Sequence, residues 1–485
     1  MSKLQTHDRN LLTDLAQAGF SNPFGEIRDT LNQRIGANLG VDHFDVDMQA
    51  FVGPLNQRLR NLASLGFDRL DKMPFSSRFE FEMAILFTLF HTFLPELDQH
   101  IENQTNNGTH HLAAPVGREL LKQLIQWGFS QPSALRYVGI FFQLRRGFYF
   151  ISRRLLGLSA PIVQLRKRLW QSLFTHDMHL YDRFFWDKME DFSTLLLGET
   201  GTGKGSAAVA IGCSAFIPYD ERTGKYVENF MKAFVSTNLS QYPASLIEAE
   251  LFGYRKGAFT GALQSHPGLF QRCSPYGAVF LDELGDVGLD VQVKLLKVLE
   301  ERVFFAVGSH ESVAFRGRII AATHRNLNEM RHQGLFRDDL YYRLSSDQIE
   351  IPSLRQRLAD SSEELSFLVR FLISRVIQEP APDTLVQFCM ASIASQVPES
   401  YTWPGNVREL EQCVRQLILA KTYVTSPLAG PDQVPEAWIR EQWSAKRIMH
   451  SVCRALYQHH SSYEKVGEIL QWDRRTVKKY LDEDV

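Results

Sequence analysis

A glycine-rich loop set between a short apolar run and a helix-forming run constrains the fold of this chain more than any other feature. The loop, Gly198-Glu-Thr-Gly-Thr-Gly203-Lys204, fits the pattern G-x-x-x-x-G-K; the run Ser193–Leu197 precedes it and Ala207–Ile211 follows it. Glycines let backbone N–H groups converge on phosphate oxygens, a helix N-terminus favours anions, and a lysine neutralises the charge of the β- and γ-phosphates. The sequence therefore predicts a strand, a phosphate-binding loop and a helix, in that order.

Three further short runs of apolar or β-branched residues follow the loop, at Phe234–Thr237, Ala278–Leu281 and Arg318–Thr323. Segments with helical character separate them. Strands that alternate with helices indicate a parallel sheet covered by helices on both faces. The predicted fold class between about residues 160 and 350 is therefore α/β.

Chain length and local patterning predict further domains around this core. With 485 residues the chain has room for about three domains. Apolar residues at helical spacing dominate before and after the core, and a Pro- and Gly-containing stretch indicates a linker. The predicted divisions are a mostly helical N-terminal domain at 1–155, the α/β core at 156–352, a helical segment at 353–425, a linker at 426–440 and a small helical module at 441–485.

Composition excludes several classes of protein. A net charge of −2 gives no global basic field, so binding of nucleic acid would need a local patch. Five dispersed cysteines without a Cys-x-x-Cys pair favour reduced thiols over a metal cluster. The start of the chain is polar, and the apolar stretches Met83–Leu94 and Tyr137–Phe150 are too short or interrupted by arginines to span a bilayer. We expect a cytoplasmic protein without a membrane partner, in which both stretches are buried helices.

An acidic pair ends one of the predicted strands. Asp282 and Glu283 follow the apolar run Ala278–Leu281, so a buried strand would carry both carboxylates to the carboxyl edge of the sheet. Beside a phosphate-binding loop such a pair suits magnesium and water chemistry, whereas the alternative is a solvated acidic helix start.

A hexapeptide of small residues around one Phe-Thr pair lies between the loop and the acidic pair. In Gly257-Ala258-Phe259-Thr260-Gly261-Ala262 the glycines permit a sharp turn that presents the aromatic ring at its tip. Alone, this would be an ordinary exposed hairpin. Within this core it closely resembles the loop with which bacterial sigma-54-dependent transcriptional activators, which are AAA+ ATPases, grip the sigma factor. The resemblance covers about residues 195 to 425.

This resemblance implies ATP and Mg²⁺ as cofactors and assigns roles to the residues around the loop. Asp282 would hold the metal–water shell and Glu283 would polarise the attacking water. Asn238 matches an asparagine that pairs with the catalytic glutamate in the family, although alone it reads as a turn residue. Arg408 matches an arginine of the helical lid at 353–425 that contacts phosphate. The other residues expected at the nucleotide are Gly198, Glu199, Thr200, Gly201, Thr202, Gly203, Lys204, Gly205 and Ser206.

Two positions depart from the family pattern. Gly205 stands where phosphate-binding loops have Ser or Thr and where sigma-54 activators commonly have Glu, and it weakens the first helical turn. Thr323 and His324 match the sensor strand, but the family usually has Asn in place of His324. For Gly205 we expect that nucleotide binding survives and that turnover is slower than in relatives. His324 keeps a hydrogen-bonding side chain in the sensor strand but adds a group that titrates near neutrality.

Two arginines resemble those that the family sends into the site of a neighbouring subunit. Arg337 and Arg343 lie in Phe336-Arg-Asp-Asp-Leu-Tyr-Tyr-Arg-Leu344, and a guanidinium suits the spread charge of a phosphoryl group. Arginines supplied in trans imply a ring, a hexamer by family analogy. The alternative is a pair of surface ion pairs with Asp338 and Asp339.

The last residues of the chain read as helix, turn, helix and resemble the Fis-type helix-turn-helix that ends many of these activators. The expected buried seam is Val466, Ile469, Leu470, Trp472, Val477 and Leu481. The expected DNA-binding residues are Arg474, Arg475, Thr476, Lys478 and Lys479. A basic helical face can also be merely solvated, and Gln471-Trp472 replaces the Gly and aliphatic residue that the family often has in the turn.

Residues 1–155 show no pattern of a receiver domain. His91, Glu96 and His100 match no strong metal-ligand spacing, so an unknown ligand or protein is the expected partner of this region. The whole pattern implies an ATP-hydrolysing activator that remodels the complex of sigma-54 and RNA polymerase while bound to upstream DNA. Two alternatives stay open: a DNA-binding regulator that binds nucleotide with little or no hydrolysis, and an AAA+ remodeller of a different protein.

Overall fold

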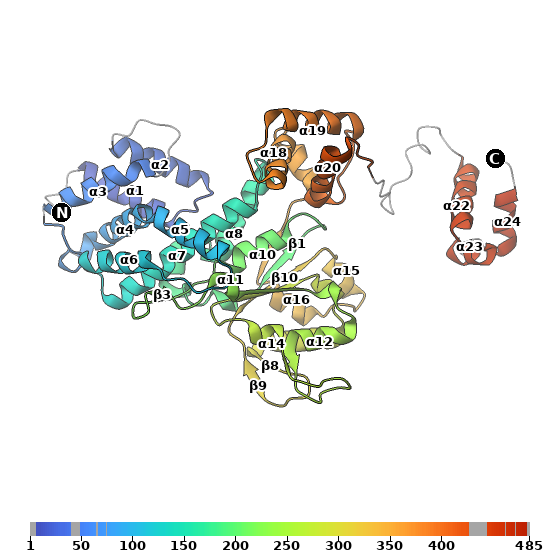
Figure 1. The fold of residues 1–485 in the computed structure, drawn as a ribbon, viewed down its shortest axis with the longest axis horizontal. Helices are drawn as coiled ribbons and strands as arrows, with labels where there is room; N and C mark the ends of the chain where they lie inside the picture. The colour runs from blue at the N-terminus through green and yellow to red at the C-terminus, as the bar shows by residue number, and fades with distance from the viewer. Residues whose placement is uncertain are drawn as a thin grey trace. The chain divides into compact units, whose positions relative to one another are not determined.

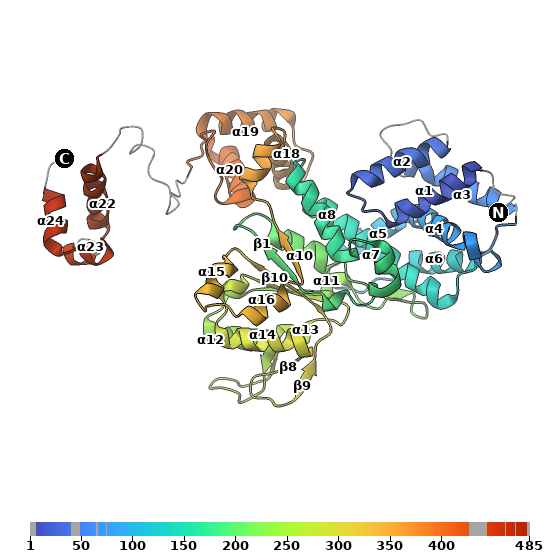
Figure 2. The same cartoon turned by 180° about the vertical axis from the view of Figure 1, so that it is seen from behind.

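The computed structural model describes residues 6–39, 49–64, 66–73, 75–425, 444–460, 462–470 and 472–482. Two compact units make up the chain, Met1–Tyr423 and Val424–Val485 (Figures 1 and 2). The predicted linker at 426–440 lies outside the described residues, and the finer domain divisions remain predictions.

A five-stranded parallel sheet forms the centre of the first unit, with the strand order β11-β1-β10-β7-β4. Its strands are β1 (Thr194–Leu197), β4 (Phe234–Asn238), β7 (Ala278–Asp282), β10 (Arg318–Thr323) and β11 (Asp347–Glu350). Four of them fall on the runs that the sequence predicts, which confirms the α/β class. The edge strand β11 was missed because Asp-Gln-Ile-Glu contains a single apolar residue.

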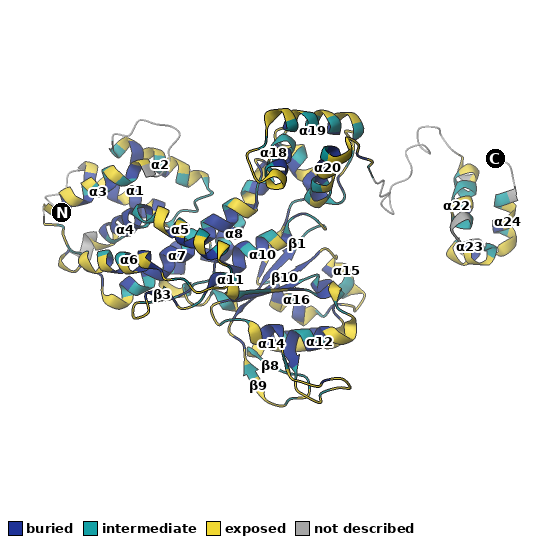
Figure 3. Cartoon of the chain, viewed as in Figure 1, coloured by how far each residue is buried: buried dark blue, intermediate teal, exposed yellow. Residues whose placement is uncertain are grey.

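The two faces of the sheet bury alternate residues in different cores, as the side-chain period of two requires. Leu196 and Phe280 point into a core shared with the helices of the N-terminal region, whereas Leu195 and Leu281 point into a core on the other face. Figure 3 shows the strands buried between helices. The principal core helices are α10 (Lys204–Gly212), α12 (Ala244–Phe252), α14 (Leu289–Glu301), α15 (Leu327–His332) and α16 (Asp338–Leu344).

Two short hairpins extend from the core. One pairs β5 (Gly253–Tyr254) with β6 (His266–Pro267), and the other pairs β8 (Val303–Phe305) with β9 (Ser312–Ala314).

The described N-terminal region is helical, as predicted. Its helices are α1 (Thr6–Phe20), α2 (Glu26–Leu39), α3 (Gln49–Ser64), α4 (Phe75–Thr92), α5 (Leu94–Asn106), α6 (Pro115–Gln126), α7 (Gln131–Arg154) and α8 (Ala160–Phe174). These helices are not separated from the α/β core, because Phe142 and Phe150 of α7 belong to the same buried cluster as Ala207 and Ile211 of α10.

Both apolar stretches singled out in the sequence lie in buried helices of this region, in and beside α4 and in α7. None of the described helices is long and apolar enough to cross a membrane.

The segment after the sheet folds as a helical subdomain with its own core. Its helices are α17 (Leu354–Asp360), α18 (Glu364–Ile377), α19 (Asp383–Gln396) and α20 (Asn406–Ala420). A Ser353 capping box with Gln356 starts α17 and therefore fixes the point at which the chain leaves the sheet.

The second unit contains α22 (Ala445–His460), α23 (Tyr463–Leu470) and α24 (Arg474–Asp482). Val466 and Val477 are fully buried between the helices, as the seam predicts, but Ile469 is 45 % exposed. The expectation for Ile469 was wrong because the short helix α23 turns only one narrow face toward its neighbours. Gly467 is needed at this contact, since an added Cβ would lie 2.6 Å from the Trp472 carbonyl oxygen.

Candidate nucleotide-binding site

A pocket of about 370 Å³ lies where the phosphate-binding loop meets the helical subdomain. Gly201 has a φ of +81° and comes so close to α20 that an added Cβ would lie 2.1 Å from the Gly405 carbonyl oxygen. The lining of the pocket includes Thr200, Gly201, Thr202, Gly203, Lys204, Gly205, Ser206, Asn238, Asp282, Glu283 and Arg408. The structure therefore brings residues from four of the predicted motifs to one cavity.

The loop lysine is held over the glycine loop. Lys204 Nζ donates to the carbonyl oxygens of Gly198, at 2.8 Å, and Glu199, at 3.1 Å. Burial lowers the pKa of Lys204, and the nearby carboxylates of Glu283 and Asp282 oppose this shift. The ammonium group thus stands at the start of α10, where the helix N-terminus also favours an anion.

Asp282 and Asn238 lie side by side because their strands pair in parallel with these two residues in register. The Asn238 amide donates to the Asp282 carboxylate over 3.4 Å. Burial raises the pKa of Asp282, Glu283 raises it further, and Lys204 counteracts the shift. An anionic carboxylate at this position therefore depends on nearby positive charge.

Glu283 is held by His324 rather than by Asn238. Its backbone is left-handed, with a φ of +57°, and its carboxylate lies 2.7 Å from His324 Nδ1 and 3.3 Å from the His324 backbone N–H. The expectation that Asn238 pairs with the glutamate is not met here, because the left-handed turn directs Glu283 toward the end of β10.

Thr323 is fully buried at the end of β10, and its hydroxyl accepts a hydrogen bond of 3.1 Å from the Arg325 backbone N–H. This hydrogen bond therefore stabilises the turn that positions His324. His324 itself remains largely exposed.

Beside the pocket, the helical subdomain contacts the phosphate-binding loop through residues that sequence reasoning missed. Asn406 donates to the Glu199 carboxylate and to the Thr200 carbonyl oxygen, both at 3.1 Å, and Arg355 forms an ion pair of 2.5 Å with Glu199. Asn406 lies in the Trp-Pro-Gly-Asn segment that precedes Arg408, so its motif was visible even though its contact was not. Arg154, at the end of α7, lines the pocket itself, and nothing in the sequence indicated this.

Arg337 and Arg343 lie outside the lining of this pocket. Arg337 pairs with Asp339 at 2.7 Å, as the surface alternative predicts, while Asp338 pairs with Arg331. Arg343 donates to the Leu299 carbonyl oxygen instead, at 3.1 Å.

The hexapeptide forms the loop between β5 and β6. The Gly257 N–H donates to the Ala262 carbonyl oxygen at 2.9 Å, which closes the loop. Phe259 is 41 % exposed although its ring meets the Tyr254 ring edge-on at 4.9 Å, and Thr260 is also exposed. The neighbouring hairpin is tied to this one by the Arg255–Glu311 ion pair and by the hydrogen bond from the Arg255 N–H to the Val307 carbonyl oxygen.

The basic residues of the second unit share the exposed face of α24. Asp473 caps this helix by accepting from the N–H groups of Arg475, at 2.8 Å, and Thr476, at 3.0 Å. Arg474, Arg475, Lys478 and Lys479 are exposed, and Thr476 is half-buried. Arg474 also pairs with Glu464 of α23 at 2.9 Å.

The carboxylates of Asp282 and Glu283 fit a magnesium–nucleotide complex, because Mg²⁺ prefers oxygen ligands and binds through one or two carboxylates together with phosphates. Gly205 cannot supply the hydroxyl ligand that many such loops provide. Among the described residues no separate cluster of three or more His, Cys, Asp or Glu side chains could hold a metal ion.

Comparison with known families matches residues 181–350 to the family described as Sigma-54 interaction domain. The hydrogenase transcriptional regulatory protein HoxA of Cupriavidus necator is 42 % identical over 260 residues, which are 54 % of this chain and 47 % of HoxA. The DNA-binding transcriptional regulator NtrC of Azospirillum brasilense is 37 % identical over 268 residues, 51 % of this chain and 50 % of NtrC. The chain thus spans about half the length of the curated relatives that it matches.

Among solved structures, NtrX from Brucella abortus in complex with ATP aligns with 74 % of this chain and 78 % of its own, at 22 % identity and a TM-score of 0.42.

Proposed function

We propose that this chain, whose residues 181–350 belong to the sigma-54 interaction domain family, is a transcriptional activator that hydrolyses ATP to remodel the closed complex of sigma-54 and RNA polymerase. One observation carries the proposal. A continuous segment that starts at Asn238, beside the acidic pair, runs through α12 and β5 to the exposed ring of Phe259. A change at the phosphate end of the pocket would therefore move the loop directly.

At the nucleotide, each group has a chemical task. When bound, ATP with Mg²⁺ would supply the phosphoryl group that is transferred to water, polarised by the metal ion. Lys204 and the N-terminus of α10 would hold the phosphates, and Arg408 would reach them from α20. Asp282 would orient the metal's water shell, and Glu283 would orient the attacking water from its position against His324.

Coupling to the loop would start from the pair formed by Asn238 and Asp282. Movement of the Asp282 carboxylate on loss of the γ-phosphate would be transmitted through their hydrogen bond to Asn238. The segment that leads to the loop begins at Asn238. Phe259 and Thr260 would then bind sigma-54, since an exposed aromatic on a hairpin tip is suited to a protein partner. The ion pair between Arg255 and Glu311 would make both hairpins move together.

Oligomerisation would complete the site. Arg337, which is the N-cap residue of α16 and is half-buried, and Arg343, which is exposed on α16, lie outside the lining of their own subunit's pocket. Both would enter the pocket of the next subunit in a ring, a hexamer by family analogy.

The second unit would tether the ring to upstream DNA. Four exposed cations on α24 suit contacts with phosphates and with base edges in the major groove. The helices of residues 1–155 would receive the signal, as a ligand or a protein, that controls the ATPase.

ATP turnover by the purified full-length chain tests the proposal. Wild-type protein should release phosphate, and Glu283→Gln should lower the turnover number at least about 100-fold while ATP still binds, because water activation is lost but the phosphate contacts remain. Glu350→Gln is the matched control, since Glu350 is an exposed glutamate at the end of β11 and outside the pocket. Binding of ATP without any turnover would contradict the proposal.

A nucleotide-binding regulator that does not hydrolyse ATP is the second candidate. Gly205, which presents no side chain at the start of α10, favours it, as does the engagement of Glu283 by His324. If wild-type protein binds ATP without turnover but still binds DNA, this candidate replaces the first.

A further inference from the structure

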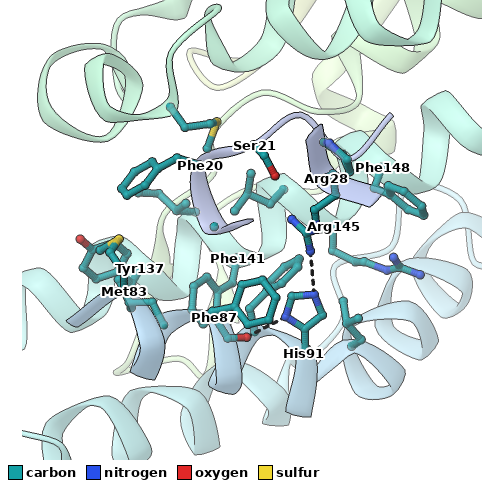
Figure 4. A pocket seen from close by; sticks show the side chains of 18 of the residues that line it. Phe20, Ser21, Arg28, Met83, Phe87, His91, Tyr137, Phe141, Arg145 and Phe148 are labelled. Atoms are coloured by element: carbon teal, nitrogen blue, oxygen red, sulfur yellow. Dashed lines mark hydrogen bonds between the residues drawn. The ribbon is translucent and has the colours of Figure 1, made fainter. Parts of the chain in front are cut away.

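The N-terminal helices line a partly open cavity of about 670 Å³ that is separate from the nucleotide pocket. Figure 4 shows side chains of its wall. Helices α1, α2, α4, α5, α7 and α8 all contribute to its wall. The lining is dominated by apolar and aromatic side chains, among them Phe20, Phe87, Phe90, Phe141 and Phe148. Its size and character are those of a small-molecule site.

Arg28 brings a positive charge into this apolar lining. Nη1 donates to the Ala18 carbonyl oxygen at 2.7 Å, Nε donates to the Asn32 amide oxygen at 3.0 Å, and Nη2 lies 3.3 Å from His91 Nε2. These contacts use three of the five N–H groups of a guanidinium. In the described part of the chain Arg28 forms no ion pair within 4 Å. Burial lowers its pKa to about 10, so the group is still cationic at neutral pH.

The other charged groups of the lining are already neutralised. Arg145 binds Asp98 through two hydrogen bonds of 2.5 and 2.6 Å, and Asp182 pairs with Arg136 at 3.3 Å. His91 lies with Nδ1 2.7 Å from the Phe87 carbonyl oxygen, as Figure 4 shows, and burial lowers its pKa to about 3, so it is neutral. Among the described residues, Arg28 is therefore the one charged side chain of the lining without an ion-pair partner within 4 Å.

We propose that this cavity binds a small monocarboxylic acid. The carboxylate would accept hydrogen bonds from the two remaining N–H groups of Arg28, since a guanidinium in a partly buried apolar setting is stabilised by an anion that also hydrogen-bonds to it. The apolar body would lie against the rings of Phe87 and Phe141. An aromatic acid and a medium-chain fatty acid present this same chemistry.

The role of this acid as the signal for the activator rests on the proposed function, whereas the binding of the acid to the cavity does not. Binding can be measured without ATP, sigma-54 or DNA, so failure of the site and failure of the motor give different results.

Isothermal titration of the full-length chain with phenylacetate and octanoate tests the site, with 2-phenylethanol and 1-octanol as uncharged analogues. At least one acid should bind saturably, with one site per chain, and at least about tenfold more tightly than its alcohol, because the alcohol leaves the Arg28 charge uncompensated. The acid that binds more tightly shows whether the apolar body of the preferred ligand is aromatic or aliphatic. Failure of both acids to bind saturably, or equal affinity for acid and alcohol, would overturn the proposal.

The variant Arg28→Met removes the positive charge and retains the apolar lining, so it separates the effect of the charge from that of the cavity. It should weaken binding of the preferred acid about tenfold or more while the affinity for the alcohol stays within about twofold. Arg60→Met, which removes an exposed arginine of α3, should change neither affinity. If Arg28→Met does not fold, Leu94→Trp provides the second variant: it narrows the cavity, keeps Arg28 and should weaken binding of acid and alcohol alike. Unchanged acid binding in either folded variant would overturn the proposal.

Discussion

Arg145 and Arg146 are neighbours in α7, yet their guanidinium groups bind different parts of the protein. Arg145 lines the N-terminal cavity and pairs with Asp98, whereas Arg146 is fully buried and donates to the carbonyl oxygens of Cys213, at 2.6 Å, and Ala215, at 2.7 Å. These carbonyls follow directly on α10, the helix that begins with Lys204. One helix thus joins the cavity wall to the helix of the phosphate-binding loop, and its last residue, Arg154, lines the nucleotide pocket.

Replacing Arg146 should destabilise the first unit. Arg146→Met removes two charge-assisted hydrogen bonds and leaves two buried carbonyl oxygens unpaired, so we expect a loss of about 2 to 4 kcal/mol in the free energy of unfolding. Arg153→Met is the control, because Arg153 lies in the same helix and is exposed, and its contacts are the ion pair with Glu102 and the hydrogen bond and ring contact with Tyr149, together worth about 1 kcal/mol. Thermal melting of both variants makes the comparison, and equal melting temperatures would refute the structural role of Arg146.

Removing residues 1–155 should destabilise the α/β core that remains, in addition to removing the N-terminal helices. The deletion strips α7 from α10 and exposes Ala207 and Ile211, which are buried in the core that both regions share. We expect the shortened chain to melt at least about 10 °C below the full-length protein or to aggregate. A chain that ends at Tyr423, without the second compact unit, should melt at the same temperature as the full-length protein. A fully stable core after the N-terminal deletion would contradict the shared core.

Two glycines of the phosphate-binding segment should respond in opposite ways to substitution. Around Gly205 an added Cβ meets nothing within 4 Å, so Gly205→Ser should fold at least as stably, and it supplies a hydroxyl at the position where such loops bind Mg²⁺. Turnover should rise about twofold to tenfold. Gly201→Ser, in contrast, places its Cβ against the Gly405 carbonyl oxygen in a left-handed backbone and should weaken ATP binding at least about tenfold. Similar behaviour of both variants would contradict this geometry.

His91 should make the protein sensitive to acid. Burial and the neighbouring charges of Arg28 and Arg145 lower its pKa from 6.5 to about 3. Between these values the unfolded chain binds a proton that the folded chain does not, so stability falls as the pH drops from 6.5 toward 3. At pH 5 the loss is about 1 to 2 kcal/mol.

His91→Gln should therefore reduce the difference in melting temperature between pH 7 and pH 5 by about 2 to 5 °C. His110→Gln, which replaces an exposed histidine, serves as the control and should leave the difference unchanged. An unaltered difference in the His91 variant would show that this histidine does not stay neutral in the folded protein.

Much of the fold could be predicted from local patterns. The glycine loop, the acidic pair and four of the five strands are contiguous in the chain, and their chemistry depends on neighbours in sequence. The pairing of Glu283 with His324 could not be predicted, because it depends on a left-handed turn after β7. Exposure of Ile469 was missed for a similar reason, since a short helix offers few positions to bury.

The N-terminal cavity lay beyond sequence reasoning altogether. Its wall combines Phe20, Arg28, His91, Arg145 and Trp170, which come from five helices. No spacing within one helix marks such a set. Arg28 in particular looks like any surface arginine until the surrounding helices are in place.

Formation of open promoter complexes by sigma-54 RNA polymerase, measured with purified components, tests the central claim most directly. Wild-type protein with ATP should produce open complexes, whereas Phe259→Ala should hydrolyse ATP at a rate within about threefold of wild type and yet lower their yield at least about tenfold, because the exposed ring is lost while the pocket is intact. Tyr276→Ala, which removes an exposed aromatic outside the loop, should leave the yield unchanged. Wild-type protein that turns over ATP but opens no sigma-54 promoter, or a Phe259→Ala variant that opens promoters normally, would contradict the account.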